Sequence, residues 1–350
     1  MSRPDALNVL RADPPIAETP DHALTADVTP SASVYIRSNF PTPVLGEDHR
    51  VRVGGAVSTT FDFGLPELRT LERRTIVMTM ECAGNDRLGM TPIPEGEPWN
   101  HGAVSTVEWT GVSLGTLLDR AGVRDDAVEI LAVGADHGLR EEFDRSVRFA
   151  RSLPLSVAAH DDTIIAFEMN GEPLSPVHGA PFRLVVPRWY GMASVKWLEA
   201  IEAIVEPFNG HFQRARYVYE EGNSVTPVTT MRVKSFITAP REGDEVVAGA
   251  VTVSGWAWSG DGYIRSVDVR VGDGDWTPAH IEPLSHEYAW QRWSLELMLP
   301  ERGTMNAEHT TIRIASRATD SSGATQPEAI AWNRLGYGNN AIRSVTVKVR

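Results

Sequence analysis

The residue pattern changes after Val225-Thr226-Pro227, and this change divides the chain into two parts. Beyond it, short apolar runs alternate with glycine, aspartate and proline, and these runs cover 251–253, 266–271, 294–299, 311–315 and 344–349. Strands at this spacing with turn residues between them are typical of a β-sandwich. A chain of 350 residues can form two domains with a core each. We therefore expect an all-β sandwich as the second domain, over 225–350.

The preceding part, over 34–224, mixes strand and helix patterns. The apolar runs typical of buried strands lie at 51–53, 128–133, 163–169 and 182–186. Helices are expected at 65–73, which begins near a proline, and at 114–121, which Gly122 ends. Because the two kinds of element do not alternate regularly, we expect an α+β domain rather than a doubly wound sheet.

Composition narrows the class of protein. A hydrophobic content of 42% with 23% charged residues indicates a soluble globular protein, and no run of about 18 apolar residues predicts a membrane span. The net charge of −13 argues against a general nucleic-acid binder. No signal peptide or twin-arginine stretch is visible, so a cytoplasmic location is expected. Residues 1–33 lack periodicity and are expected to form a flexible or surface-wrapped N-terminal arm.

Cys82 is the only cysteine, and it follows the apolar run 75–80 and precedes Ala83-Gly84-Asn85. A lone cysteine cannot form an internal disulfide or build a zinc or iron–sulfur cage by itself. It can be an inert core thiol, a nucleophile or the single thiolate anchor of a metal-bearing cofactor. Burial as a small apolar residue is the common case for a free cysteine. The neighbouring Arg87 favours a thiolate electrostatically.

Motifs of several other chemistries are missing from the sequence. It contains no Gly-x-Ser-x-Gly elbow, His-Glu-x-x-His pair or Walker loop. The segment 336–341 resembles the glycine-rich fingerprint of dinucleotide-binding proteins. It lies too close to the C-terminus for a complete dinucleotide-binding unit, so it indicates a turn. Asp273 and Asp275 in a glycine-rich stretch are equally expected in a hairpin turn, since no bidentate glutamate follows at calcium-loop spacing.

The remaining motifs occur in an order and spacing that resemble the sulfite oxidase family of molybdopterin enzymes. The resemblance covers nearly everything from residue 34 to the end. In the second part, it includes 254–259 and 331–334, which look like the family's immunoglobulin-like dimerisation domain, over 225–350. In the first part, the matching segments are 35–41, 80–87, 99–105, 167–171, 178–183 and 191–197.

The resemblance implies roles for single residues. Cys82 would supply the protein thiolate on molybdenum, beside the dithiolene of one molybdopterin, in line with the preference of thiolates for softer redox metals. The positions matching those that hold the pterin and its phosphate are Tyr35, Ile36, Arg37, Ser38, Asn39, Asp136, His178, Arg183, Ser194, Val195 and Lys196.

Some of these residues have plain alternatives. Arg183 and Lys196 suit a phosphate, and each interrupts a buried run, which favours a function. His178, before a glycine, is by itself more often a loop histidine, and Asp136 is equally common as a turn aspartate.

The resemblance also implies a pocket for a small oxyanion beside the metal. Arg37 and Arg87 match the arginines that surround the anion, and guanidinium forks suit oxyanions. Trp99 matches the tryptophan that lines the pocket, although a packed loop aromatic is an equal alternative without the family context.

Four positions depart from the family pattern. Phe167 aligns with a tyrosine whose hydroxyl lies near the metal, and loss of such a hydrogen bond costs roughly 1–3 kcal/mol. The third substrate arginine aligns with Gln291, with Arg292 next to it. Asp86 stands where many members of the family have a second basic residue, and Asn39 stands where many of them have a histidine. These departures predict a less positive pocket and put sulfite itself in doubt as the substrate.

The resemblance implies a homodimeric, haem-free molybdopterin oxidoreductase that oxidises sulfite to sulfate. No Cys-x-x-Cys-His motif and no residues for a cytochrome b5-like domain are present. Electrons would therefore pass to an external acceptor such as a cytochrome c. Two alternatives stay open: the same cofactor acting on another oxyanion or an organic S- or N-oxide, and a binding protein without enzymatic activity.

Overall fold

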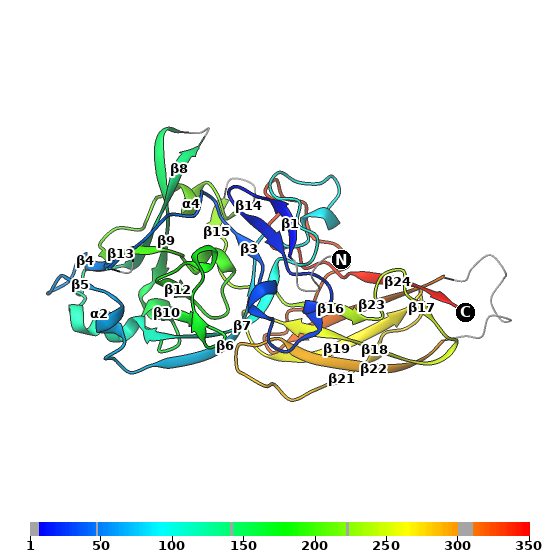
Figure 1. Cartoon of the computed structure of the whole chain (residues 1–350). Helices are drawn as coiled ribbons and strands as arrows, with labels where there is room; N and C mark the ends of the chain where they lie inside the picture. The colour runs from blue at the N-terminus through cyan, green and yellow to red at the C-terminus, as the bar shows by residue number, and fades with distance from the viewer. Residues whose placement is uncertain (1–6, 47, 141–142, 222–223, 300–310) are drawn as a thin grey trace.

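The structure is a computed structural model that describes residues 7–46, 48–140, 143–221, 224–299 and 311–350. Its two parts lie side by side, with the strands after residue 230 grouped on the side of the C-terminus (Figure 1). The described residues form mostly strands with few helices. No helix among them is long and apolar enough to cross a membrane.

The N-terminal segment is not a free arm in the described range from residue 7. Strands β1 (Asn8–Arg11), β2 (Ile16–Glu18) and β3 (Ile36–Arg37) form a small antiparallel sheet. Ile16 and Leu24 are buried, and the indoles of Trp256 and Trp290 donate to backbone carbonyls of this segment. The expectation of a flexible arm is therefore wrong for 7–33, because Ile16 and Leu24 belong to the apolar cores of the molecule, although Val9 and Val28 remain exposed. Residues 1–6 lie outside the described range.

Two sheets form the framework of the first domain. The first has the order β11-β10-β7-β6, with β12 also paired to β10, and its strands are β6 (Arg74–Glu81), β7 (Val104–Ser113), β10 (Ile164–Met169), β11 (Glu172–Pro173) and β12 (Arg183–Val185). The second has the order β5-β4-β13-β8-β9, and its strands are β4 (Val51–Gly55), β5 (Phe61–Phe63), β8 (Glu129–Arg140), β9 (Phe143–Pro154) and β13 (Leu198–Ile204). The β8–β9 hairpin projects from the domain (Figure 1).

The helices of this domain are short. They are α1 (Leu65–Leu68), α2 (Leu114–Ala121), α3 (Leu155–Ala158) and α4 (His211–Arg214). The expected helix at 114–121 is confirmed, and Gly122 ends it in a left-handed conformation with φ 65°. The helix expected at 65–73 stops at Leu68. The expected strands are all present, several of them longer than the apolar run that predicted them.

The described part of the second domain consists of two facing sheets. One has the order β16-β18-β22-β21, from β16 (Lys234–Ala239), β18 (Gly249–Trp258), β21 (His280–Ile281) and β22 (Gln291–Leu299). The other has the order β17-β24-β23-β19-β20, from β17 (Glu245–Val246), β19 (Ile264–Val271), β20 (Thr277–Pro278), β23 (Thr311–Asp320) and β24 (Ser344–Val349). Buried residues of both sheets share one apolar core. The hairpin of β14 (Val218–Glu221) and β15 (Ser224–Pro227) links the domains.

Candidate functional site

Strand β6 delivers Cys82 to the centre of the first domain. Residues 76–81 are buried, and Cys82 follows directly, 7% exposed. Its backbone N–H donates to the carbonyl of Ala103 at 2.8 Å, and the N–H of Asn85 donates back to the Cys82 carbonyl at 2.9 Å. The chain therefore turns sharply after Cys82, and the thiol lines two cavities.

The first cavity, with a volume of about 770 Å³ that includes its opening to solvent, has a positive lining. Arg37, Arg183 and Lys196 line it, and Asp136 is the one carboxylate among its described lining residues. The other expected cofactor-binding residues on its wall are Tyr35, Ile36, Ser38, Asn39, Cys82, His178 and Ser194. The structure therefore brings these predicted positions together on one wall from five separate segments of the chain.

The cationic side chains Lys196 and Arg183 on this wall are buried, and burial lowers the pKa of both. Burial, together with the charge of Arg183, lowers the pKa of Lys196 well below its ordinary range. Burial also lowers the pKa of Arg183 to about 10. Lys196 Nζ donates to Ser38 Oγ at 3.0 Å and to the Val177 carbonyl at 2.8 Å, so its partners are neutral acceptors. Two desolvated cations held by neutral groups favour an anionic ligand.

His178 and Asp136 provide further polar groups on the same wall. Burial and the nearby cations Lys196 and Arg183 lower the pKa of His178 to about 3, so its imidazole is neutral at physiological pH. Burial raises the pKa of Asp136 to about 7. The Oδ1 atom of Asp136 has no hydrogen-bond partner within the described residues. A ligand donor in the cavity would satisfy it.

One backbone position next to these residues requires glycine. Gly179 has φ 105°, and a Cβ there would meet the Cβ atoms of Lys196 and Arg183 at 3.0 and 3.1 Å. The chain turns tightly here and brings His178 next to both cations.

The second cavity, of about 620 Å³, shares four residues with the first: Arg37, Asn39, Cys82 and Tyr217. Its other described lining residues are Arg87, Glu95, Gly96, Glu97, Trp99, Arg140, Phe212, Arg216 and Tyr337. The thiol thus lies between a cavity suited to a large anionic ligand and one bordered by four arginines and several aromatic rings.

Asn39 and Arg87 are oriented by distinct contacts in this second cavity. Asn39 accepts hydrogen bonds from Arg37 at 3.0 Å and Arg140 at 3.2 Å, and its amide donates to the Tyr217 hydroxyl at 3.2 Å. The Arg87 guanidinium donates to the Leu335 carbonyl at 2.9 Å and to the Glu97 carbonyl at 2.6 Å. Because both acceptors are neutral, the positive charge of Arg87 remains available to an anion.

Comparison with known proteins matches both halves of the chain. The family description "Oxidoreductase molybdopterin binding domain" matches residues 39–212, and "Mo-co oxidoreductase dimerisation domain" matches residues 225–350. The chain is 31% identical to the sulfite oxidase of Gallus gallus, over 97% of this chain and 80% of that protein. The chain belongs to the sulfite oxidase family.

Other relatives in this family are longer. Mitochondrial sulfite oxidase of Homo sapiens is 33% identical over 99% of this chain, and the chain spans 66% of that protein's length. Among solved structures, the sulfane dehydrogenase SoxCD from Paracoccus pantotrophus is 29% identical with a TM-score of 0.81, covering 99% of this chain and 86% of that one. The resemblance read from the sequence is therefore confirmed.

The residues of the sulfite oxidase-like site fit a molybdenum–molybdopterin cofactor. Within the part of the chain that the structure describes, no group of three or more His, Cys, Asp or Glu side chains gathers that could hold a metal ion. A metal at Cys82 would need most of its ligands from a non-protein group. The neighbouring cavity offers the volume, two buried cations and the orphaned carboxylate oxygen that a phosphorylated pterin requires.

Two predicted catalytic residues lie elsewhere. Phe167 is buried in the main apolar core and lines neither cavity, so reading it as a missing active-site hydroxyl is wrong. Tyr217 and Tyr337 line the second cavity instead. Arg292 pairs with Asp27 and packs over Trp256 on the second domain, away from Cys82. The Gln291 amide donates to the Glu282 carbonyl at 2.7 Å, so neither residue replaces a substrate arginine.

Two further placements correct the sequence interpretation. Val195 is fully buried in the apolar core and lines neither cavity, although its neighbours Ser194 and Lys196 do. Asp86 also faces away from both cavities, into a buried ion cluster with Lys234. The pocket is therefore not made less positive by Asp86, contrary to expectation.

Sequence reasoning missed Arg140, Arg216, Tyr217 and Tyr337. Arg140 stands at the end of β8, and Arg216 and Tyr217 follow α4. One available signal was the run Arg214-Ala215-Arg216-Tyr217, which puts two cations and a ring before the domain boundary. Tyr217 also has a left-handed φ of 52°. Such strained conformations are frequent at functional sites, but they cannot be predicted from the sequence.

Proposed function

We propose that this chain is a molybdopterin-dependent oxidoreductase that oxidises sulfite to sulfate. The observation that supports it best is the place of Cys82, the sole thiol, where an anion-binding cofactor cavity meets an arginine-bordered second cavity. The chemistry that such a cofactor supplies when bound is two-electron oxygen-atom transfer. Sulfite and water become sulfate, two protons and two electrons, and the electrons leave to an external carrier such as a cytochrome c.

In this proposal the chain's own residues position and neutralise the substrate. Arg37 and Arg87 bind the oxyanion, whose charge they compensate as it approaches the reacting centre. Trp99, 1% exposed, excludes water from one side. The Tyr217 hydroxyl, held by Asn39, donates a hydrogen bond to a substrate oxygen. Cofactor binding falls to Lys196, Arg183, His178, Asp136 and Ser38.

The experiment combines metal content and turnover on one preparation. We expect about one molybdenum per chain, since one thiolate and one cofactor cavity are present, and sulfite-dependent reduction of ferricyanide or cytochrome c. A preparation fully loaded with molybdenum that shows no turnover above background would refute sulfite as the substrate. A folded preparation from a cofactor-competent host that contains no molybdenum would instead support the non-enzymatic alternative.

A sulfur compound larger than sulfite is a second candidate. Arg140 and Arg216 line the second cavity in addition to Arg37 and Arg87, so its positive lining offers more contacts than a four-atom ion can make. The structural relative is named a sulfane dehydrogenase. Organic sulfinates and sulfane-bearing compounds, assayed beside sulfite and S- or N-oxides, separate these substrates by kcat/KM.

We also propose that the second domain has the immunoglobulin-like topology and forms a homodimer. The matched dimerisation-domain description supports this. Sedimentation velocity at micromolar concentration should give a mass near twice 38.4 kDa.

A further inference from the structure

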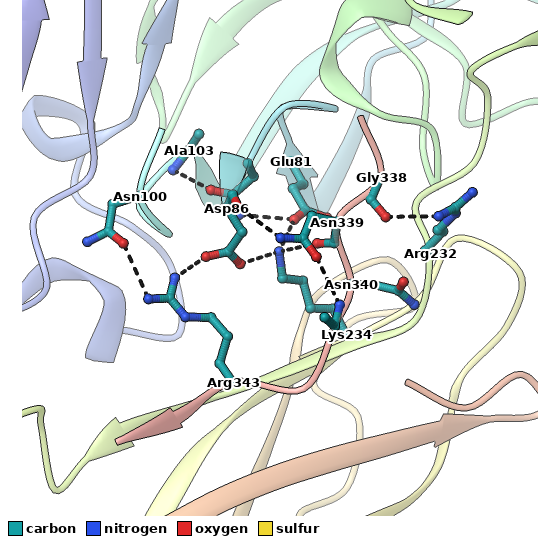
Figure 2. A network of polar contacts seen from close by, with 12 residues as sticks. Glu81, Asp86, Asn100, Ala103, Arg232, Lys234, Gly338, Asn339, Asn340 and Arg343 are labelled. Atoms are coloured by element: carbon teal, nitrogen blue, oxygen red, sulfur yellow. Dashed lines mark hydrogen bonds and ion pairs between the residues drawn. The ribbon is translucent and has the colours of Figure 1, made fainter. Parts of the chain in front are cut away.

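A buried ion cluster lies behind the Cys82 segment, on the side away from both cavities. It consists of Glu81 and Asp86 from the first domain and Lys234 and Arg343 from the second. Lys234 Nζ lies 3.0 Å from Glu81 Oε1 and 2.6 Å from Asp86 Oδ2, and all three side chains are 2% exposed. Arg343 pairs with the other Asp86 oxygen, so that the Asp86 carboxylate lies between Lys234 and Arg343 (Figure 2).

The cluster combines two positive with two negative charges. Burying an unpaired charge costs several kcal/mol, whereas a fully paired group largely offsets the cost of desolvation. Each carboxylate is satisfied from the second domain, and the second Glu81 oxygen accepts from the Trp258 indole at 3.0 Å. Lys234 contacts both carboxylates at once, and these flank Cys82 on either side in the chain.

The backbone of the same segment is also held by the second domain. The Gly338 N–H donates to the Ala83 carbonyl at 2.8 Å. The Asn339 amide donates to the Asp86 carbonyl at 2.8 Å, and the Asn339 carbonyl accepts from Lys234 at 3.0 Å (Figure 2). The segment 81–87 is thus fixed at both ends and in its middle by residues from outside its own domain.

The conformation of Asp86 explains what these contacts achieve. Asp86 has a left-handed φ of 66°, which persists in a non-glycine residue only where the surroundings determine it. This turn directs the Asp86 side chain toward Lys234, while the side chains of Cys82 and Arg87 reach the second cavity. Losing the ion pairs would release the turn and, with it, the directions of the thiol and the guanidinium.

We propose that Lys234 is a positioning residue that holds Cys82 and Arg87 in place through Glu81 and Asp86. The second domain then shapes the metal-anchoring segment in addition to any role in dimerisation. The inference rests on the proposed cofactor site for its purpose, although the geometry of the segment can be tested without substrate.

The lone cysteine makes the test specific. In the full-length chain prepared without cofactor, a thiol reagent such as DTNB reports on Cys82 alone. We expect Lys234→Gln to raise the labelling rate by about tenfold or more, because the segment opens locally. In protein expressed with cofactor, molybdenum content should fall by more than half. Lys348→Gln, an exposed lysine on β24, is the matched control and should change neither quantity.

Global destabilisation is distinguished from positioning by a second control. Gly122→Ala weakens the end of α2 without touching the segment, so it should lower the melting temperature but leave labelling well below that temperature unchanged. Wild-type labelling and full molybdenum loading in a folded Lys234→Gln protein would overturn the proposal. Equal labelling increases in Gly122→Ala and Lys234→Gln at matched stability would overturn it as well.

Two further variants decide the matter if Lys234→Gln does not fold. Asp86→Asn/Lys234→Gln keeps the buried cluster neutral, and Arg343→Gln removes a cation whose side chain is 37% exposed. Both should fold and label faster than wild type, and wild-type rates in either folded variant would refute the role of the cluster. Absence of sulfite turnover in the fully molybdenum-loaded wild-type protein, together with faster labelling of the variants, would contradict the proposed function only.

Discussion

At the scale of single residues, Cys82 experiences opposing influences. Burial raises the pKa of its thiol, and the positive charge of Arg37 works against this. A cysteine binds a metal ion as the thiolate, so a cation bound at this sulfur would displace the proton. The metal–sulfur bond would offset the free energy that it costs to bury the charged thiolate. The site therefore holds a protonated, unreactive thiol until the metal arrives.

Replacing Cys82 by serine tests this sulfur directly. We expect Cys82→Ser to lose molybdenum and all turnover, because a hydroxyl is a poor ligand for a soft redox metal. The backbone bond from residue 82 to the Ala103 carbonyl is retained, so the far-ultraviolet circular dichroism should not change. Molybdenum analysis of the folded variant is the measurement, and full metal content would exclude the ligand role.

In the proposed function, Tyr217 supplies the hydroxyl whose position the sequence interpretation gave to Phe167; Tyr217 lines the second cavity. We expect Tyr217→Phe to lower kcat/KM about tenfold, since one hydrogen bond contributes on the order of 1 kcal/mol. The ring stays stacked on Tyr337, 5.2 Å between centroids, so stability should hardly change. Tyr263→Phe, on a ring 64% exposed, is the control. Unchanged kcat/KM in Tyr217→Phe would remove the hydroxyl from the mechanism.

Asp136 and His178 of the cofactor cavity give opposite pH dependences of stability. The pKa of Asp136 rises from 3.8 to about 7, so the folded state binds the proton more tightly and stability falls as pH rises from about 4 to 7. The pKa of His178 falls from 6.5 to about 3, so the unfolded state binds the proton more tightly and stability rises with pH from about 3 to 6.5.

Single variants should separate these contributions in the protein without cofactor. Relative to wild type, His178→Gln should lose about 1.4 kcal/mol of stability for each pH unit gained between about 4 and 6, and Asp136→Asn should gain a similar amount. Urea unfolding at several pH values measures both slopes. Three parallel profiles would show that neither group has its pKa shifted by the fold.

At the scale of elements, strong local signals were read correctly from the sequence. The apolar run 163–169 became β10 (Ile164–Met169), and 344–349 is β24. The residues that line the cofactor cavity lie mostly in other segments, and they were predicted from the order of motifs along the chain, which requires no knowledge of the geometry. Tyr217 and Arg140 were missed because their relation to Cys82 depends on how β8 and the segment after α4 fold back over the cavity, which no local pattern encodes.

Gly122 is a local signal from which the end of helix α2 was predicted correctly, and its role can be tested. Its φ of 65° closes α2, and its N–H bonds to the Leu118 carbonyl at 2.9 Å. We expect Gly122→Ala to destabilise the protein by about 1 kcal/mol, since an L-residue pays to enter the left-handed region. Gly274→Ala is the control, because Gly274 is not in that region. Equal denaturation midpoints for both variants would contradict the helix end described.

At the scale of the whole molecule, the sequence placed the domain boundary near residue 225 but not the closeness of the domains. The main apolar core runs through both of them: it includes Phe236, Trp256 and Leu335 of the second domain together with strands of the first. Trp256 stacks on Trp290 at 5.0 Å and also donates to the N-terminal segment. Contacts between segments that are far apart in the chain produce no periodic pattern of apolar residues in the sequence. For this reason the sequence predicted a flexible arm at residues 7–33.

A continuous core predicts that the two domains unfold together. Separating them would expose the apolar surfaces of Trp256 and Trp258 to water, which costs about 1.5–3 kcal/mol for each large side chain, and it would break the ion pair of Lys234 with Asp86. Scanning calorimetry should therefore show one transition whose calorimetric and van't Hoff enthalpies agree. In Lys234→Gln the coupling weakens, so the transition should broaden or divide. Two well-separated transitions in the wild-type chain would mean that the second domain unfolds independently. The contacts of Lys234 with Glu81 and Asp86 would then be lost before the first domain unfolds.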